Sequence, residues 1–187
     1  VSFVLDAGDR PVYAADGAKT VDAAMFRRFA PAAAAVLTRV RKAEASRPGG
    51  VKASPGPSDK PVQASTIAEV NGHLYILSAT LVQPDFGHAR IQGARAPVVV
   101  TGMLLEAPFL EMFSTRYMLT NLHVHDSDSR AEPGEAHVPL VSLEGAHVAT
   151  LDWMPQTPGR TMLWQVGPPI VALVCLLSLA ALLLYRR

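Results

Sequence analysis

This sequence has one cysteine, few charged side chains and almost no net charge, and each shortage excludes a class of protein. Cys175 is the only cysteine among 187 residues, so no disulfide framework holds the chain together. Charged residues make up 18% of the chain, against about 25% in typical soluble domains, whereas apolar residues make up 49%. This balance excludes an intrinsically disordered chain. The formal charge of +1 gives no electrostatic case for nucleic-acid binding.

The familiar catalytic and nucleotide-binding motifs are also missing. The chain contains no GxGxxG, P-loop, HExxH, GxSxG or CxxC pattern. Ser114 and Ser142 lack the sharp turn that presents the nucleophile of a serine hydrolase. We therefore predict no enzymatic activity and no cofactor for this stretch of chain.

The apolar excess is concentrated at the carboxyl end. Residues 168–185 read PPIVALVCLLSLAALLLY, carry no charge, and as a helix cover about 27 Å, close to the ~30 Å hydrocarbon core of a bilayer. Trp164 and Tyr185 suit the two membrane interfaces, and Arg186 and Arg187 follow at once. A buried core helix is the alternative, but a run apolar on all sides exceeds what a domain of this size buries. The sequence therefore predicts a transmembrane helix within residues 161–187.

The positive-inside rule places the terminal arginines in the cytoplasm and residues 1–160 outside it. Residues 1–160 hold all sixteen acidic residues and fifteen of the seventeen basic residues, which gives a net charge of −1. They contain no cysteine, which suits an oxidising periplasm. We therefore predict a protein of the bacterial inner membrane with an extracytoplasmic domain at 1–160. We also expect a first span before Val1 and a cytoplasmic part after Arg187.

Turn signals divide residues 1–160 into short strands. Apolar runs at 62–70 and 73–82 meet at Asn71-Gly72, the strongest short hairpin signal, because a type I′ turn needs positive φ at both positions. Similar patterns predict six to eight strands in all, with the remaining ones at 2–6, 11–15, 97–105, 119–125, 138–143 and 147–153. Strands joined by hairpins predict an α+β fold, with an antiparallel sheet and helices covering one face.

Two helices are expected among these strands. The first covers the region around Pro31, where apolar residues recur every three or four positions while Arg41 lies off this stripe and should face away from the core. The second, shorter helix begins at Pro108. Residues 47–61 are rich in Pro, Gly and Ser and predict a mobile surface loop. A linker between two domains is the alternative for this stretch.

His123 and His125 are the strongest candidates for metal ligands. They are two residues apart on a predicted strand, so both imidazoles should point to the same side. Asp126 and His137 are candidates to join them. The alternative is the polar, solvent-facing side of a half-buried strand, because no Cys or Glu-x-x-His partner accompanies the pair.

Two further pairs are candidates for ligand binding. His73 and Tyr75 share a strand face and are candidates for the lining of a ligand cavity, with an ordinary aromatic core contact as the alternative. Arg116, next to Tyr117 on the short helix, offers a bidentate guanidinium to a carboxylate. A surface arginine beside a core tyrosine is the alternative reading of that pair.

Three stretches together resemble a known family. They are FVLDAGDRPVYAADG (3–17), PFLEMFSTRYMLTNLHV (108–124) and VPLVSLEGAHVATLDWMPQTPG (138–159). This pattern is similar to the type-four CHASE domain, an extracytoplasmic sensory module of bacterial cyclic-di-GMP enzymes and histidine kinases. The resemblance implies a PAS-like or Cache-like antiparallel sheet that runs into a membrane span, followed by a diguanylate cyclase, a phosphodiesterase or a kinase. It implies no ligand residues.

The function expected from these observations is an input domain that senses an unidentified small molecule or an envelope stress. Trp153, Pro155 and Pro158 are predicted to couple the last strand to the span, because the prolines fix φ and stiffen the link. We expect a homodimer, and the span offers small residues for packing at Ala172, Ser178 and Ala181. The alternative is a membrane-anchored periplasmic binding or assembly subunit without a signalling output. A periplasmic enzyme, the third class, would need metal at the histidine pair.

Overall fold

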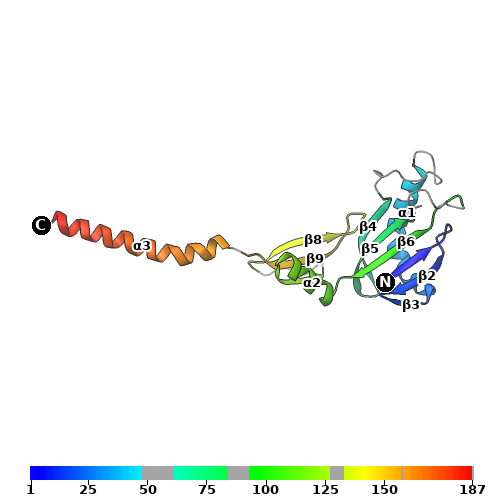
Figure 1. The fold of residues 1–187 in the computed structure, drawn as a ribbon, viewed down its shortest axis with the longest axis horizontal. Coiled ribbons are helices and arrows are strands. Elements are labelled where there is room, and N and C mark those ends of the chain that lie inside the picture. Colours follow the sequence, from blue (N-terminus) through cyan, green and yellow to red (C-terminus); the bar gives the residue numbers. More distant parts are fainter. Residues whose placement is uncertain (48–60, 84–92, 127–132, 157, 187) are drawn as a thin grey trace.

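The computed structural model describes residues 1–47, 61–83, 93–126, 133–156 and 158–186. Within these ranges, nine antiparallel strands form two separate sheets, and three α-helices accompany them (Figure 1). We call the six-stranded sheet the distal sheet and the three-stranded sheet the proximal sheet, according to their distance from the C-terminal helix. The predicted mobile loop at 47–61 lies almost wholly outside the described residues.

The distal sheet has the strand order β3-β2-β1-β6-β5-β4. Its longest hairpin joins β4 to β5 through Asn71 and Gly72, whose φ angles of 54° and 79° are both positive, as the predicted type I′ turn requires. The bounds of the strands are β1 (Ser2–Leu5), β2 (Pro11–Asp16), β3 (Lys19–Val21), β4 (Gln63–Val70), β5 (His73–Leu81) and β6 (Val98–Leu104).

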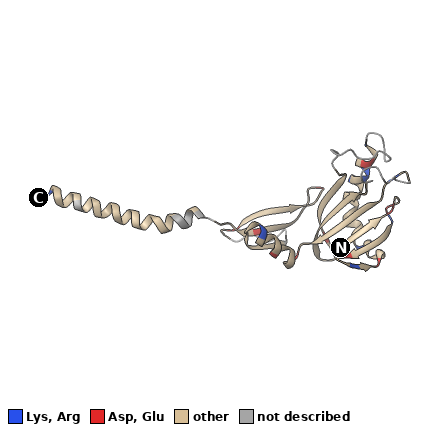
Figure 2. Cartoon of the chain, in the orientation of Figure 1, with Lys and Arg blue, Asp and Glu red and all other residues tan. Residues whose placement is uncertain are grey.

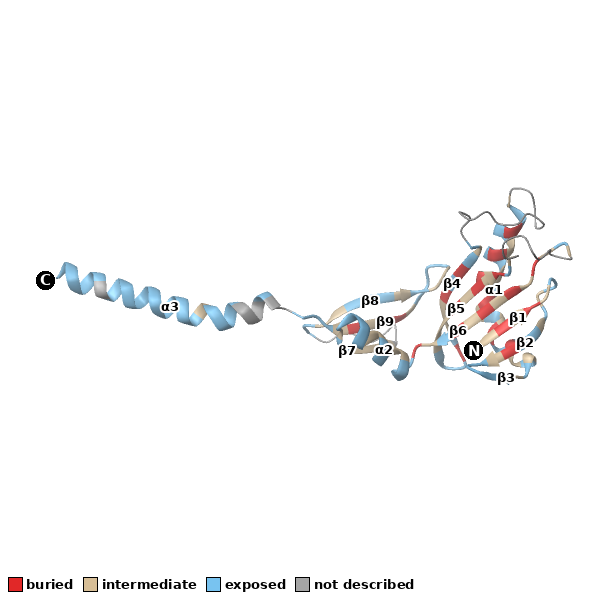
Figure 3. Cartoon of the chain, viewed as in Figure 1, coloured by how far each residue is buried: buried red, intermediate tan, exposed pale blue. Residues whose placement is uncertain are grey.

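Helix α1 (Phe26–Ala45) covers one face of the distal sheet and forms the main core with it (Figures 1 and 3). A single 3-10 turn, η1 (Ala23–Met25), precedes the helix, and the Asp22 side chain caps that turn by accepting from the Ala24 amide at 2.8 Å. Phe3 packs its ring 5.2 Å from the rings of both Phe26 and Phe29. The other fully buried members of this core include Leu5, Val36, Val40, Leu77, Val98 and Val100.

An ion network ties the end of α1 to the distal sheet. The Arg41 guanidinium lies 2.6 Å from Asp9 Oδ1 and 2.7 Å from Glu44 Oε2, and Glu44 Oε1 accepts from the Ala96 amide at 2.6 Å. Burial works against the charged form of Arg41, but its hydrogen bonds to Asp9 and Glu44 outweigh this, so its pKa lies above the ordinary value. Arg41 therefore faces inward, and the prediction that it faces away from the core was wrong.

The proximal sheet has the order β7-β9-β8 and contains little buried apolar surface (Figure 3). Among its described side chains only Ala149, Thr150 and Asp152 are buried. Helix α2 (Ala107–Tyr117) leads into this sheet from β6, and it ends at Met118, which adopts a left-handed conformation with φ of 53°. The bounds of the strands are β7 (Thr120–Asp126), β8 (Ala136–Val141) and β9 (His147–Met154).

Two polar contacts join the proximal part to the distal sheet. The amide of Leu143, in the turn between β8 and β9, donates to Thr66 Oγ1 of β4 at 2.8 Å. At the start of β5, His73 Nδ1 lies 2.6 Å from Oε1 of Glu106, the residue that precedes α2. The two sheets therefore meet through a turn and a helix start, and not through a shared strand.

Helix α3 (Pro158–Tyr185) extends away from both sheets (Figure 1). Its segment Leu163–Tyr185 has no charged residue and contains a stretch of 18 residues with a mean hydropathy of 2.4 and no buried residue (Figure 2). By length and composition it can cross a membrane, as the sequence predicted. The α+β class, the antiparallel strands and the flanking helices are likewise confirmed. The division of the strands into two sheets was not indicated by the sequence, and the short edge strand β3 was not predicted.

Candidate functional site

Among the described residues, a cavity and a cluster of possible metal ligands are the two candidate binding sites. The first is a cavity of about 440 Å³ between the N-terminal part of α1 and the edge where β5 and β6 meet the β4–β5 turn. This volume is within the range of small-molecule sites. Its wall includes Phe29 and Tyr75, whose rings lie 5.2 Å apart, together with Arg28, Asp16 and His73. The cavity therefore combines an aromatic wall with charges of both signs.

The predicted ligand-binding residues separate into two groups. His73 and Tyr75 line the same cavity, but Tyr75 also packs against Phe29, as in the alternative interpretation, and His73 pairs with Glu106. Arg116 and Tyr117 do not reach it, because both lie on α2, where Arg116 borders a separate surface depression and Tyr117 is 53% exposed. Tyr117 packs its ring 4.4 Å from that of Phe113 on the same helix. The four residues therefore do not form one site.

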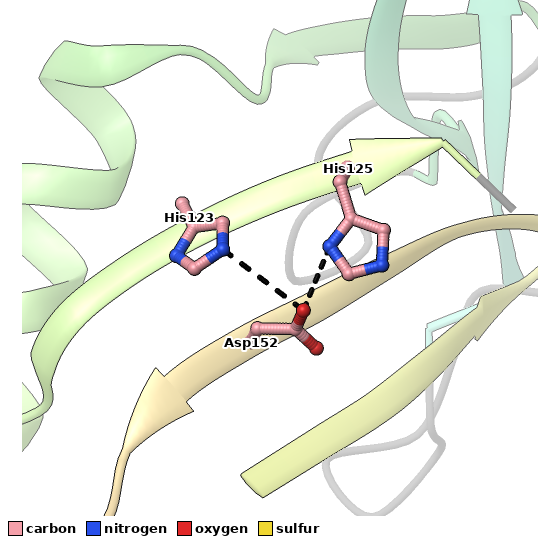
Figure 4. A group of neighbouring side chains, drawn as sticks. All are labelled: His123, His125 and Asp152. Carbon is pink, nitrogen blue, oxygen red and sulfur yellow. Dashed lines mark ion pairs between the residues drawn. The ribbon is translucent and has the colours of Figure 1, made fainter. Parts of the chain in front are cut away.

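The second place is a cluster of His123, His125 and Asp152 in the proximal sheet (Figure 4). His125 Nδ1 lies 2.7 Å and His123 Nε2 lies 4.0 Å from the same oxygen, Asp152 Oδ2. One ligand atom from each residue lies within 4.8 Å of the other two. Both histidines come from β7 and the aspartate from β9, so the cluster bridges two neighbouring strands.

Strand register explains why these side chains meet. His123 is opposite Asp152 and His125 is opposite Thr150, so both imidazoles lie on the face of the sheet that carries Asp152. The pairing is irregular between Thr120 and His123, and Asn121 within this irregularity has φ of 55°. Irregularities of this kind re-aim side chains near functional sites. Here the Asn121 carbonyl lies 2.9 Å from His123 Nδ1 and orients the ring.

Burial differs sharply across the cluster. The Asp152 side chain is 0% exposed, that of His125 is 18% exposed and that of His123 is 42% exposed. Within the described part of the chain, no hydrogen bond reaches either oxygen of Asp152, and its contact with His125 Nδ1 at 2.7 Å is an ion pair when the imidazole is protonated. A carboxylate buried in this way requires a compensating positive charge.

The predicted metal pair is therefore brought together, and the structure adds a partner that the sequence did not point to. Asp152 had no spacing signal, because it meets the histidines only through the pairing of β7 with β9. His137 is opposite Asp152 on β8, but it is exposed and does not belong to the close group among the described residues. The backbone of Asp126 ends β7, and its side chain lies outside the described residues.

The residues predicted to couple the domain to the span lie between this cluster and α3. Trp153 is the next-to-last residue of β9, Pro155 follows the strand, and Pro158 is the first residue of α3. Gln156 was not predicted, yet its side-chain amide donates to the Met118 carbonyl at the end of α2 at 3.1 Å. The link is therefore held to the proximal part by a direct hydrogen bond.

No family model and no curated protein matches this chain. The resemblance to the type-four CHASE domain therefore stays a prediction that rests on its strand and turn motifs.

Proposed function

We propose that this chain is the sensory input region of a bacterial transmembrane signalling protein, with residues 1–160 in the periplasm and the apolar segment Leu163–Tyr185 of α3 in the inner membrane. The observation that carries the proposal is the position of the His–Asp cluster on the strand that leads to α3. Asp152 lies near the end of β9, and α3 begins at Pro158. A ligand that acts on β9 therefore acts on the chain segment nearest to the membrane helix.

The contacts around the link support transmission of a displacement. β9 is the central strand of the proximal sheet, so a shift in its pairing with β7 or β8 moves its end. Pro155 and Pro158 restrict φ in the link, and Gln156 holds it against the end of α2. A ligand shifts the equilibrium between two positions of α3 only to the extent that it binds one of the two conformations more tightly than the other. A few kcal/mol is the usual scale of such coupling.

The resemblance to the type-four CHASE domain supports a cytoplasmic output after Arg187. A diguanylate cyclase or phosphodiesterase is the first expectation and a histidine kinase the second. We propose a homodimer in the membrane, since transmembrane signalling of this kind needs two copies that move relative to each other. The exposed Ala172 and Ser178 of α3 offer small side chains for close helix packing.

The test is an insertion of four glycines after Gln156 in the complete protein. The output is measured as cyclic-di-GMP or autophosphorylation while pH, osmolarity and divalent-cation supply are varied. We expect the wild type to respond to at least one condition and the insertion variant to respond to none, because flexible residues cannot transmit the displacement of β9.

The matched control is the same insertion after Gly17, in the exposed turn between β2 and β3, far along the chain from the link. This variant should respond like the wild type. A full response from the variant with glycines after Gln156 contradicts the coupling. A complete protein without any output region after the span supports the anchored binding or assembly subunit in its place.

A further inference from the structure

We propose that His123, His125 and Asp152 hold a divalent transition-metal ion, with zinc the best fit to the donor set. The ion would lie between β7 and β9 on the proximal sheet and accept His123 Nε2, His125 Nδ1 and Asp152 Oδ2 as its protein ligands (Figure 4). That the ion is also the signal for α3 rests on the function proposed above. The binding itself does not depend on that function.

The first argument is the charge of Asp152. Its side chain is fully buried, and no hydrogen bond from the described residues reaches either of its oxygens. Its ion-pair contact is with His125 Nδ1 at 2.7 Å, and an imidazole carries positive charge only when protonated. A buried carboxylate without a compensating charge is costly, so such groups in native proteins are paired or bind metal. A cation placed beside Oδ2 removes this cost, and Oδ2 is the oxygen that both histidines face.

The second argument is the orientation of His123. The Asn121 carbonyl can only accept, so the 2.9 Å contact makes His123 Nδ1 the protonated nitrogen. In a neutral imidazole this leaves the lone pair on Nε2, the atom that faces Asp152 Oδ2. A lone pair and a carboxylate oxygen repel each other unless a cation lies between them. A histidine that donates to a backbone carbonyl with its other nitrogen is also the usual arrangement of a metal ligand.

The third argument is the spacing of the donors. Zinc–nitrogen and zinc–oxygen bonds of about 2.0–2.1 Å place tetrahedral ligands roughly 3.3 Å apart. The two measured separations from Asp152 Oδ2, 2.7 Å and 4.0 Å, bracket this value. One ligand atom from each residue lies within 4.8 Å of the other two, so no pair departs from this spacing by more than about 1.5 Å.

The ligand types select the class of ion. Two imidazoles and one carboxylate suit zinc and neighbouring transition metals, whereas calcium and magnesium prefer oxygen ligands throughout. The 42% exposure of His123 leaves a side of the cluster open for entry of the ion and for a fourth ligand. Three protein ligands with one open position allow exchange with the surroundings, which a sensor of metal supply requires.

The competing account is a proton in place of the metal. Protonation of His123 would turn its contact with Asp152 into an ordinary ion pair, and the cluster would then bind no metal. The experiment below separates the two accounts, because it measures metal uptake directly.

The test is titration of the tag-free full chain, in detergent micelles and stripped with chelator, with Co²⁺ and then with competing Zn²⁺. We expect one Co²⁺ per chain with the visible absorption of a low-symmetry site, and displacement of Co²⁺ by Zn²⁺. His123→Ala and Asp152→Asn should each weaken binding by about ten-fold or more, the scale on which even outer contacts of a metal site act. Circular dichroism of each variant verifies that it is folded.

His73→Ala is the matched control, since His73 is exposed, lies on β5 of the distal sheet and is outside the close group. This variant should bind Co²⁺ like the wild type. The inference is overturned if the wild type takes up no Co²⁺ or Zn²⁺, or if folded His123→Ala and Asp152→Asn bind as tightly as the wild type. It is equally overturned if His73→Ala loses binding to the same extent.

The chain with four glycines after Gln156 separates this inference from the proposed function. We expect that variant to bind Co²⁺ with unchanged affinity, because the insertion follows β9 and leaves the three ligands intact. If the chain binds metal and its signalling output is unchanged by the insertion, the sensor function is contradicted and the metal site is supported. If the chain binds no metal but its signalling response is lost on insertion, the metal site is contradicted and the sensor function is supported.

Discussion

The two sheets of this protein are stabilised in opposite ways. Among the described residues, seven of the eight largest fully buried side chains are apolar and belong to the distal sheet and α1, and the eighth is Asp152 in the proximal sheet. The distal part buries aromatic rings against one another and satisfies its buried charges, as the contacts of Arg41 and Glu44 show. The proximal part buries a carboxylate that no hydrogen bond from the described residues satisfies.

This difference indicates a division of roles. A closely packed apolar layer gives a stable scaffold, whereas regions that respond to ligands are drawn from the less stable parts of a fold. Among its described residues the proximal sheet has few buried apolar side chains; it carries the metal-binding candidates and leads directly to α3, the helix that can cross a membrane. We infer that the distal sheet maintains the fold and that the proximal sheet changes its stability when it binds a ligand.

The largest expected effect comes from the distal core. Phe3→Ala should lower the free energy of unfolding by about 3–5 kcal/mol, because it leaves a cavity against Phe26 and Phe29. Val138→Ala, in β8 of the proximal sheet, should change it by no more than about 0.5 kcal/mol, since Val138 is 45% exposed. Urea unfolding in detergent micelles, followed by circular dichroism, measures both. An equal loss in the free energy of unfolding of the two variants would contradict the difference in packing between the two sheets.

The Arg41 network should give the next largest effect. Arg41→Gln leaves Glu44 and Asp9 without their main cation, and we expect a loss of about 2–3 kcal/mol. This is less than the ~3–5 kcal/mol of a fully buried pair, because the Asp9 side chain is 30% exposed. Arg39→Gln is the matched control, since Arg39 is an exposed arginine on the same helix. The same unfolding assay compares them, and a similar small loss in both variants would show that the network contributes little.

Asp152→Asn should have a smaller effect than the loss of Phe3 or Arg41, and in the opposite direction. Without metal, the substitution removes a buried charge and keeps the shape of the side chain, so we expect the stability to stay the same or rise by about 1 kcal/mol. Thermal unfolding in the presence of chelator measures this difference. A clear destabilisation would mean that the His125 contact already compensates Asp152, and that the metal adds nothing the folded protein needs.

Local signals in the sequence predicted most of the elements. The hairpin at Asn71-Gly72 and the start of α2 near Pro108 were predicted because turn and helix-start chemistry is local. β3 was missed because Lys19–Val21 is only three residues long and contains a single strongly apolar side chain. The division into two sheets was also missed, since alternation of apolar residues shows that a strand exists without showing which strand it pairs with.

The same limit explains what the sequence revealed of the site. The histidine pair was visible because two-residue spacing on one strand is a local pattern. The contribution of Asp152 was not visible, because Asp152 and His123 are 29 positions apart in the chain and meet only through the pairing of β7 with β9. Arg41 was misplaced for a related reason: its partners Asp9 and Ala96 come from distant segments, and a charged residue off an apolar stripe normally faces solvent.

Hydrogen–deuterium exchange of the full chain in detergent micelles, with and without Zn²⁺, tests the central claim most directly. Without zinc, the amides of β7 and β9 should exchange faster than those of β1, β5 and β6, because the proximal sheet opens at a lower free energy. With zinc at 100 times its Kd, exchange in β7 and β9 should slow by up to about 100-fold, while the distal strands should not change. Slower exchange in the proximal sheet without zinc, or zinc protection spread evenly over both sheets, would contradict the account.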